Sequence, residues 1–195
     1  MACYPVMLNI EGKRCLVVGG GSVALRKIQG LLECSARVTV IAPFANEKIR
    51  KLGEDGRIRL MERNYMKGDV EGYFLAVAAS DDRNVNKRVA LEASERNILV
   101  NVADDLDLSS FIVPSVVRRG ELAVAVSTGG RSPLLAKTLR RKLENILTDE
   151  YEELLNRLWE AREKVKAQEL SEEEKVKIYN GIIQDYKLVC DGKEG

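Results

Sequence analysis

The stretch CLVVGGGSVALRK, from Cys15 to Lys27, decides the fold of this 195-residue chain. Its apolar beginning predicts a buried strand over Arg14–Val18, which runs into three consecutive glycines. Apolar residues then recur at helical spacing and predict a helix from Val23 to Leu32. A strand that enters a glycine turn and leaves it as a helix is typical of a unit that binds a dinucleotide.

The glycine spacing gives each residue of the turn a physical role. In the pattern Gly19-x-Gly21-x-x-Ala24, the first glycine allows the tight turn and the second lets the backbone approach a pyrophosphate. Ala24 lets the helix pack closely on the strand, and the helix start favours an anion. The alternative is a glycine turn without a ligand. We predict that the cofactor site includes Gly19, Gly20, Gly21, Ser22, Val23 and Ala24.

Strands and helices continue to alternate through the first half of the chain. Short runs rich in β-branched residues predict further strands, and the segments between them predict helices. The expected strands are Arg37–Pro43, Arg57–Met61, Tyr73–Ser80 and Ile98–Ala103, and the expected helices are Asn46–Leu52 and Asp81–Arg96. This order predicts an α/β fold with a Rossmann-type parallel sheet that is covered on both faces.

The pattern changes after residue 110. FIVPSVV and ELAVAVST predict two strands joined through RRG, and TGGRSP leads into a helix with Ser132 as its N-cap. The apolar stripe of that helix consists of Leu135, Leu139, Leu143 and Ile146 or Leu147. Two more helices are expected over Glu150–Gln168 and Ser171–Leu188, the second capped by Ser171. We divide the chain into a nucleotide-binding domain (1–112), a small α/β segment (113–146) and a C-terminal helical domain (147–195).

Composition excludes several classes of protein and site. Apolar runs are far shorter than a membrane span, and the N-terminus lacks a signal-peptide pattern, so we expect a cytoplasmic protein without a membrane partner. The chain contains four cysteines without a C-x-x-C pair and no histidine. This composition predicts reduced structural thiols and no metal site.

Two short segments are candidates for contacts with the rest of the dinucleotide. The second strand ends in Ile41-Ala42-Pro43-Phe44 without the usual carboxylate for the ribose hydroxyls. We therefore expect backbone and small groups around Pro43 and Phe44 to hold the ribose. We favour NAD over NADP, although no carboxylate at this position repels the 2′-phosphate of NADP. Asp81 and Asp82 follow the fourth strand, and from the sequence they are suited first to capping the next helix and complementing its dipole.

Charge is distributed unevenly although the net charge is only +1. Residues 114–145 contain seven Lys and Arg against two Asp and Glu, a net charge of +5, whereas residues 146–195 contain eight against thirteen. The basic segment is suited to a polyanionic ligand, and the alternative is a solvated helix face. Nucleic acid is an unfavoured partner because aromatic residues make up only 5% of the chain.

Five stretches together resemble the precorrin-2 dehydrogenases of the siroheme-synthase family. They are YPVMLNIEGKRCLVVGGGSVALRK, VTVIAP, AASDDRNVNKRVA, NVADDLDLSSFIVPS and LAVAVSTGGRSPLLAKTLRRKLE. The resemblance implies oxidation of precorrin-2 to sirohydrochlorin with NAD as cofactor. It also implies a homodimer in which the middle segment of each chain swaps across the two-fold axis. Some members of the family also insert ferrous iron into sirohydrochlorin.

The resemblance places the family's essential aspartate at Asp104, which we predict to be the general base. The residues agree, because without histidine the proton acceptor must be a carboxylate. Asp104 lies just past the end of the fifth strand, at the carboxyl edge where open parallel sheets bind ligands. The resemblance also places the loop of Asp81 near the cofactor, as a secondary role beside helix capping, and we expect Asn101 to assist at the cofactor site. The alternative is that Asp104 is a turn residue, and Asp105 and Asp107 compete for the same assignment.

The basic segment gives the substrate residues that the resemblance implies, since precorrin-2 is a polycarboxylate. They are Arg118, Arg119, Thr128, Gly129, Arg131, Ser132 and Arg140, with Lys137 and Arg141 nearby. Two other functions stay open at this stage. One is a bifunctional dehydrogenase and ferrochelatase, and the other is a non-catalytic Rossmann module that senses NAD and regulates a partner.

Overall fold

The computed structural model describes residues 3–186, so the prediction for Cys190 and the predicted helix end at Leu188 lie outside the described residues. The chain divides into two compact units, Met1–Val113 and Pro114–Gly195, which are described separately.

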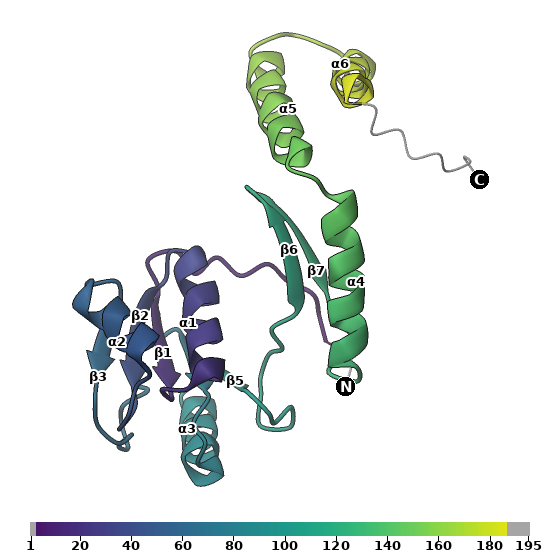
Figure 1. Cartoon of the computed structure of the whole chain (residues 1–195). Coiled ribbons are helices and arrows are strands. Elements are labelled where there is room, and N and C mark those ends of the chain that lie inside the picture. Colours follow the sequence, from purple (N-terminus) through teal and green to yellow (C-terminus); the bar gives the residue numbers. More distant parts are fainter. Residues whose placement is uncertain (1–2, 187–195) are drawn as a thin grey trace. The chain divides into compact units, whose positions relative to one another are not determined.

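The first unit contains a five-stranded parallel sheet with the strand order β3-β2-β1-β4-β5 (Figure 1). Its strands are β1 (Arg14–Val18), β2 (Arg37–Ile41), β3 (Arg59–Met61), β4 (Leu75–Ala78) and β5 (Leu99–Val102). Val18 of β1 lies level with Ile41 and with Ala78, and Ala78 lies level with Val102. The strands β2, β1, β4 and β5 therefore end level with one another at one edge, and the predicted Rossmann-type sheet is confirmed.

Alternating side chains of β1 supply both halves of the core. Cys15 and Val17 pack towards α1 (Ser22–Glu33) and α2 (Glu47–Glu54), which cover one face. Leu16 and Val18 pack towards α3 (Arg83–Glu95) on the other face. Burial on both faces explains why β1 and β4 are continuous apolar runs rather than alternating ones.

A buried polar cluster fixes the long connection from β3 to β4 against α3. The hydroxyl of Tyr65 donates a hydrogen bond to the carboxylate of Glu92, which is buried in α3. The backbone N–H of Gly68 donates to the same carboxylate at 2.5 Å, and Arg96 lies 3.5 Å from it. Burial, followed by the bond to Glu92, raises the pKa of Tyr65. A buried carboxylate is tolerated here because each of these groups neutralises or solvates it.

The free edge of β5 is closed by the segment that follows it. The hydroxyl of Ser110 accepts a hydrogen bond from the backbone N–H of Val100 at 2.8 Å, and that of Ser109 accepts one from Val102 at 2.9 Å. These bonds satisfy an edge that would otherwise pair with another strand.

The predicted strand FIVPSVV is wrong in its first half. The observed strand begins only at Ser115, because Pro114 has no N–H group to donate to a neighbouring strand.

The second unit has a two-stranded antiparallel sheet and three helices. Its elements are β6 (Ser115–Arg119), β7 (Leu122–Val126), α4 (Pro133–Ile146), α5 (Glu150–Lys166) and α6 (Glu172–Asp185). Helix α4 packs against both strands, and α5 packs against α6. Ser171 and Glu174 form the capping box of α6, which confirms Ser171 as its N-cap. Across residues 3–186, no helix combines the length and apolarity needed to cross a membrane.

The second unit buries little apolar surface. Of its described residues, the buried hydrophobic ones are Val117, Ala136, Leu154 and Val165. The predicted apolar stripe of α4 is largely open to solvent, because Leu135, Leu139 and Ile146 are all exposed. Two strands with so few buried residues fall short of an independent core.

Burial of β1 predicts the chemical reactivity of its cysteine. Burial, assisted by nearby Cys34, raises the pKa of the Cys15 thiol to about 11. We expect iodoacetamide at pH 8.5 to label exposed Cys3 at least about 100-fold faster than Cys15, because labelling of Cys15 requires unfolding of the sheet. Peptide mass spectrometry of timed samples measures both rates. In denaturant the two rates should converge, and equal rates in the native protein would contradict the buried position of β1.

Candidate functional site

The turn after β1 brings three segments into direct backbone contact. The N–H of Gly19 donates to the carbonyl of Ile41 at 2.9 Å, which continues the β1–β2 pairing beyond the strands. A Cβ on Gly19 would overlap the carbonyl of Ala79, and a Cβ on Gly20 would overlap the carbonyl of Phe44. Gly19 also has a φ of 136°, in the region that favours glycine. These two glycines are therefore required by the fold itself.

Gly21 differs from its neighbours because open space surrounds its missing side chain. No heavy atom among the described residues lies within 4 Å of a Cβ built there. Gly21 is also the N-cap residue of α1, and no side chain of the described residues caps that helix, whereas Asn46, Asp82 and Ser132 cap α2, α3 and α4. An open glycine in front of uncapped helical N–H groups fits the pyrophosphate of a dinucleotide.

The loop after β2 forms one side of the glycine turn. The N–H of Asn46 donates to the carbonyl of Gly20 at 2.9 Å, and the side chain of Asn46 caps α2 through the N–H of Ile49. Phe44 lies between the turn and this cap with 81% of its surface exposed, and Pro43 beside it is also exposed. The structure thus brings Pro43 and Phe44 next to the glycines, as a dinucleotide site requires.

The loop after β4 forms the opposite side of the glycine turn. Asp82 accepts a hydrogen bond from the N–H of Asn84 at 2.8 Å and is the N-cap of α3, so the capping role applies to Asp82. Asp81 is exposed, and within residues 3–186 its carboxylate has no hydrogen-bond or ion-pair partner. Asp81 therefore stays available to a ligand at this edge.

Asp104 lies at the same edge of the sheet, two strands away from the glycine turn. The N–H of Ala103 donates to the carbonyl of Ala78 at 2.9 Å, so β5 ends level with β4. At the usual spacing of neighbouring strands, the backbone of Asp104 lies roughly 10 Å from that of Gly19. Its carboxylate is exposed, and no described residue forms a hydrogen bond or ion pair with it.

The neighbouring Asp105 has a different role. Its carboxylate accepts hydrogen bonds from the N–H groups of Asp107 and Leu108, at 3.0 and 3.1 Å. The hydroxyl of Ser109 donates to the Asp105 carbonyl at 2.6 Å. Asp105 thus stabilises the turn that presents Asp104, and this division of roles favours Asp104 over Asp105 as the reactive carboxylate.

Buried Asn101 and half-buried Lys27 form a polar pair near this edge, and no signal in the sequence singled out Lys27. The Lys27 ammonium donates to the amide oxygen of Asn101 at 2.9 Å, and the Asn101 amide nitrogen donates to the carbonyl of Phe111 at 3.1 Å. Burial, with a smaller effect of Arg26, lowers the pKa of Lys27. Both ends of the Asn101 amide are used within the protein, so the structure shows Asn101 as a brace between α1 and the chain after β5.

Several basic residues of the second unit are engaged in ion pairs. Arg119 lies 3.2 Å from the carboxylate of Asp149 and donates to the carbonyl of Glu144 at 3.2 Å, which ties the end of β6 to the junction of α4 and α5. Arg140 pairs with Glu144 one turn along α4. Arg118 also takes part in an interaction. These contacts stabilise the unit. They also mean that fewer basic side chains are available to a ligand than the composition suggests.

The turn before α4 is largely saturated by its own hydrogen bonds. The Thr128 hydroxyl accepts a bond from the N–H of Ser132 at 3.1 Å, and the Ser132 hydroxyl accepts one from Leu135 at 3.3 Å. Gly129 and Gly130 both have positive φ, which this tight turn requires. Around it Arg131, Lys137 and Arg141 are exposed, and no described residue pairs with them. With Lys142, which is also exposed, these cations are the accessible part of the basic segment among the described residues.

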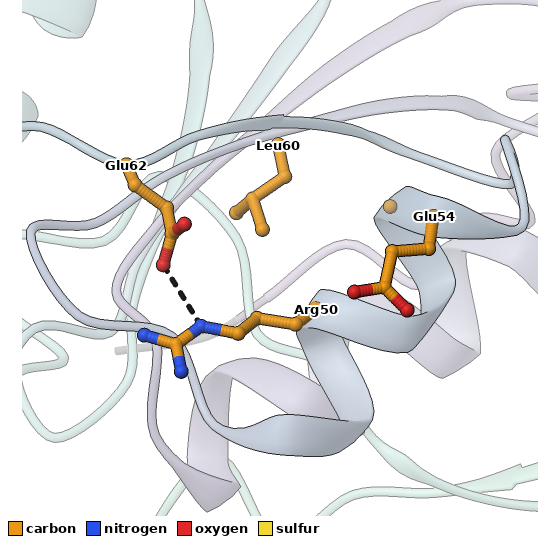
Figure 2. A pocket seen from close by; sticks show the side chains of 5 residues that line it. Arg50, Glu54, Leu60 and Glu62 are labelled. Atoms are coloured by element: carbon orange, nitrogen blue, oxygen red, sulfur yellow. Dashed lines mark hydrogen bonds and ion pairs between the residues drawn. The ribbon is translucent and has the colours of Figure 1, made fainter.

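An open hollow of about 380 Å³ lies between α2 and β3, and Figure 2 shows the side chains that line it. It is lined by Arg50, Gly53, Glu54, Leu60 and Glu62, and Arg50 and Glu62 form an ion pair at 2.9 Å across it. The hollow shares no residue with the glycine turn. Its exposed, self-paired charges give no basis for a separate site.

Together, the parallel sheet, the glycine turn and the open helix start define a Rossmann-type dinucleotide-binding protein. Comparisons with known proteins agree. Residues 6–115 match a family model described as putative NAD(P)-binding, and residues 119–146 match one described as sirohaem biosynthesis protein central.

Relatives match across both units. The chain is 40% identical to a siroheme synthase of Vesicomyosocius okutanii over 189 residues, which cover 95% of this chain and 41% of the relative. It is 43% identical to a siroheme synthase of Methylococcus capsulatus, with 85% and 35% covered. The solved structure of SirC, precorrin-2 dehydrogenase, matches with a TM-score of 0.79 and 32% identity, and covers 93% of this chain and 89% of that one.

The chain therefore belongs to the NAD(P)-binding family of siroheme biosynthesis that includes SirC and the matching part of siroheme synthases. It spans about two fifths of the length of the siroheme synthases that it matches.

The open space at Gly21 generates a direct test of the dinucleotide site. We expect Gly21→Val to fold normally, because no atom of the described structure occupies that space, and to weaken NAD binding at least about tenfold by filling the position of the pyrophosphate. Thermal unfolding and titration with NAD measure the two effects. Gly20→Ala is the matched comparison and should instead lower the unfolding temperature. Unchanged NAD affinity in folded Gly21→Val would contradict the assignment.

Proposed function

We propose that this protein oxidises precorrin-2 to sirohydrochlorin with NAD, with Asp104 as the general base. The observation that carries the proposal is the unpaired, exposed Asp104 carboxylate at the same sheet edge as the open glycine turn. Similarity to SirC, precorrin-2 dehydrogenase, over both units supports the choice of reaction and substrate.

The reaction removes one hydride and one proton from precorrin-2 and gives sirohydrochlorin, NADH and H⁺. NAD supplies the hydride acceptor when it is bound. The glycine turn and the first turn of α1 bind and orient its pyrophosphate, and Pro43, Phe44 and Asp81 line the two sides of the turn. The Asp104 carboxylate takes the proton. It is not engaged in the hydrogen bonds of the turn, because the Asp105 carboxylate accepts those bonds.

The second unit supplies the proposed substrate contacts. Exposed Arg131, and Lys137 and Arg141 further along α4, have no carboxylate partner among the described residues and match a polycarboxylate in charge. The Thr128–Ser132 turn presents Arg131. Arg118, Arg119 and Arg140 stay in the proposed substrate set, but with a lesser role, because each already takes part in an interaction.

We also propose that two chains form a homodimer through the segment 113–146, with exchange of that segment, and that residues 147–195 complete this part of the protein. Exposed Leu135, Leu139 and Ile146 on α4, and the poor core of the second unit, support an apolar partner surface. We further propose a cytoplasmic location, because the sequence combines few cysteines with short apolar runs.

The first experiment is an anaerobic assay of purified protein with freshly generated precorrin-2 and NAD. We expect NADH and sirohydrochlorin to appear together in equal amounts, and more slowly with NADP. Binding of NAD without oxidation of precorrin-2 would overturn the dehydrogenase and favour the NAD-sensing module. A parallel trial with ferrous iron and sirohydrochlorin tests the bifunctional alternative. Within residues 3–186, no three acidic or cysteine side chains are grouped to hold a metal ion.

The role of Asp104 is tested by its uncharged isostere. We expect Asp104→Asn to lower kcat by at least about 100-fold, because the proton acceptor is lost, while the Kd for NAD stays within about twofold. Asp107→Asn is the control, since it removes an exposed carboxylate from the same turn and should keep nearly full activity. Near-normal turnover by Asp104→Asn would remove Asp104 from the mechanism.

The apolar face of α4 is tested by a charge substitution. We expect Leu139→Asp to weaken dimerisation by about 30-fold or more, because a carboxylate would have to be desolvated in the proposed interface. Light scattering over a range of concentrations measures the masses. Lys142→Glu changes a charge on the same exposed helix and should stay dimeric. A Leu139→Asp protein that dimerises like the wild type would place the interface elsewhere.

A further inference from the structure

Asn86 is a polar residue on the buried stripe of α3. Val89, Ala90 and Ala93 of that helix pack on the sheet, and Asn86 lies one turn before them on the same side. Only 3% of Asn86 is exposed. Asparagine is a poor residue for a helix interior, and a buried amide is costly unless it is hydrogen-bonded. An apolar residue would satisfy the helix better, so the amide requires another explanation.

The Asn86 amide is fully directed at the main chain of one residue. Its oxygen accepts a hydrogen bond from the N–H of Ser80 at 3.0 Å, and its nitrogen donates to the carbonyl of Ser80 at 2.9 Å. One side chain therefore fixes both peptide groups that flank Ser80. Neither group takes part in the strand pairing of β4, which ends at Ala78.

The peptide that Asn86 holds is the one against which the glycine turn packs. A Cβ on Gly19 would overlap the carbonyl of Ala79 and lie 2.9 Å from the nitrogen of Ser80. The same loop continues into Asp81, whose exposed carboxylate has no partner among the described residues. The position of Asn86 thus determines where one side of the dinucleotide site lies.

We propose that Asn86 is a positioning residue for dinucleotide binding: its amide holds the main chain of Ser80 against Gly19 and so pre-forms the β4 side of the glycine turn. This inference rests on the proposed use of NAD. We call the two hydrogen bonds between the Asn86 amide and the Ser80 main chain the Asn86 clamp. Without this clamp the loop after β4 can adopt other conformations. NAD must then order the loop when it binds, which lowers the affinity for NAD. Asn86 lies inside the protein and acts only through the Ser80 main chain.

The test compares Asn86→Ala with Asn84→Ala. Asn84 lies on the same helix turn, but its side chain is exposed and only its main chain bonds to Asp82. For Asn86→Ala we expect the Kd for NAD to rise about tenfold, with kcat at saturating NAD within about threefold of wild type. Asn84→Ala should change neither quantity by more than about twofold.

Hydrogen exchange supplies a readout that does not depend on activity. In Asn86→Ala, the amides of Ser80 and Asp81 should exchange faster, whereas those of β1 should not change. Saturating NAD should restore part of the lost protection. If Asn86→Ala does not fold, Asn86→Ser, which keeps a hydrogen-bonding group, provides the same measurements.

Three outcomes would overturn the inference. A folded Asn86→Ala protein with the NAD affinity of wild type would show that the clamp is not needed for binding. A lower kcat at saturating NAD with an unchanged Kd would assign Asn86 to a different role. Absence of NAD binding by the wild-type protein would overturn this inference and the proposed function together, whereas the first two outcomes leave the proposed function intact.

Discussion

The close approach of three main-chain segments at the end of β1 is the constraint on which the rest of the site depends. Gly19 packs on the peptide after β4, and Gly20 packs on the loop after β2. Any larger residue at either position would push these loops apart. The pairing of β1 with both neighbours places them at this distance, so the sheet and the glycines require each other.

Hydrogen bonds from buried or paired side chains then fix the loops around this contact. Asn86 holds the loop after β4, Asn46 caps α2 beside Gly20, and Asp105 stabilises the turn that carries Asp104. Gly21, Asp81 and Asp104 are left open among these fixed neighbours. This division between committed and open groups is what pre-organisation requires, since ligand contacts need rigid support.

The two units differ in how they reach stability. The first unit buries both faces of its sheet, and even its edge strand β5 is closed by Ser109 and Ser110. In the second unit, apolar residues of α4 are exposed. Arg119 and Arg140 form ion pairs that stabilise its helices. Its stability therefore depends more on polar contacts, and its exposed apolar residues suit the proposed homodimer.

The sequence by itself determined the order of strands and helices and the glycine turn, because apolar periodicity and local glycine spacing are short-range signals. The family was indicated separately, by the resemblance of five stretches to known members. Only the tertiary structure decided which polar residues are available. Asp104 and Asp105 are neighbours of the same type, and hydrogen bonds separate their roles. Arg119 and Arg131 looked alike in sequence, but Arg119 has partners brought from distant segments. Folding also brings together the Lys27–Asn101 pair and the Asn86 clamp on Ser80. Of these residues, Asn86 could have been found from the sequence, because a polar residue on the buried stripe of α3 is costly unless it is hydrogen-bonded.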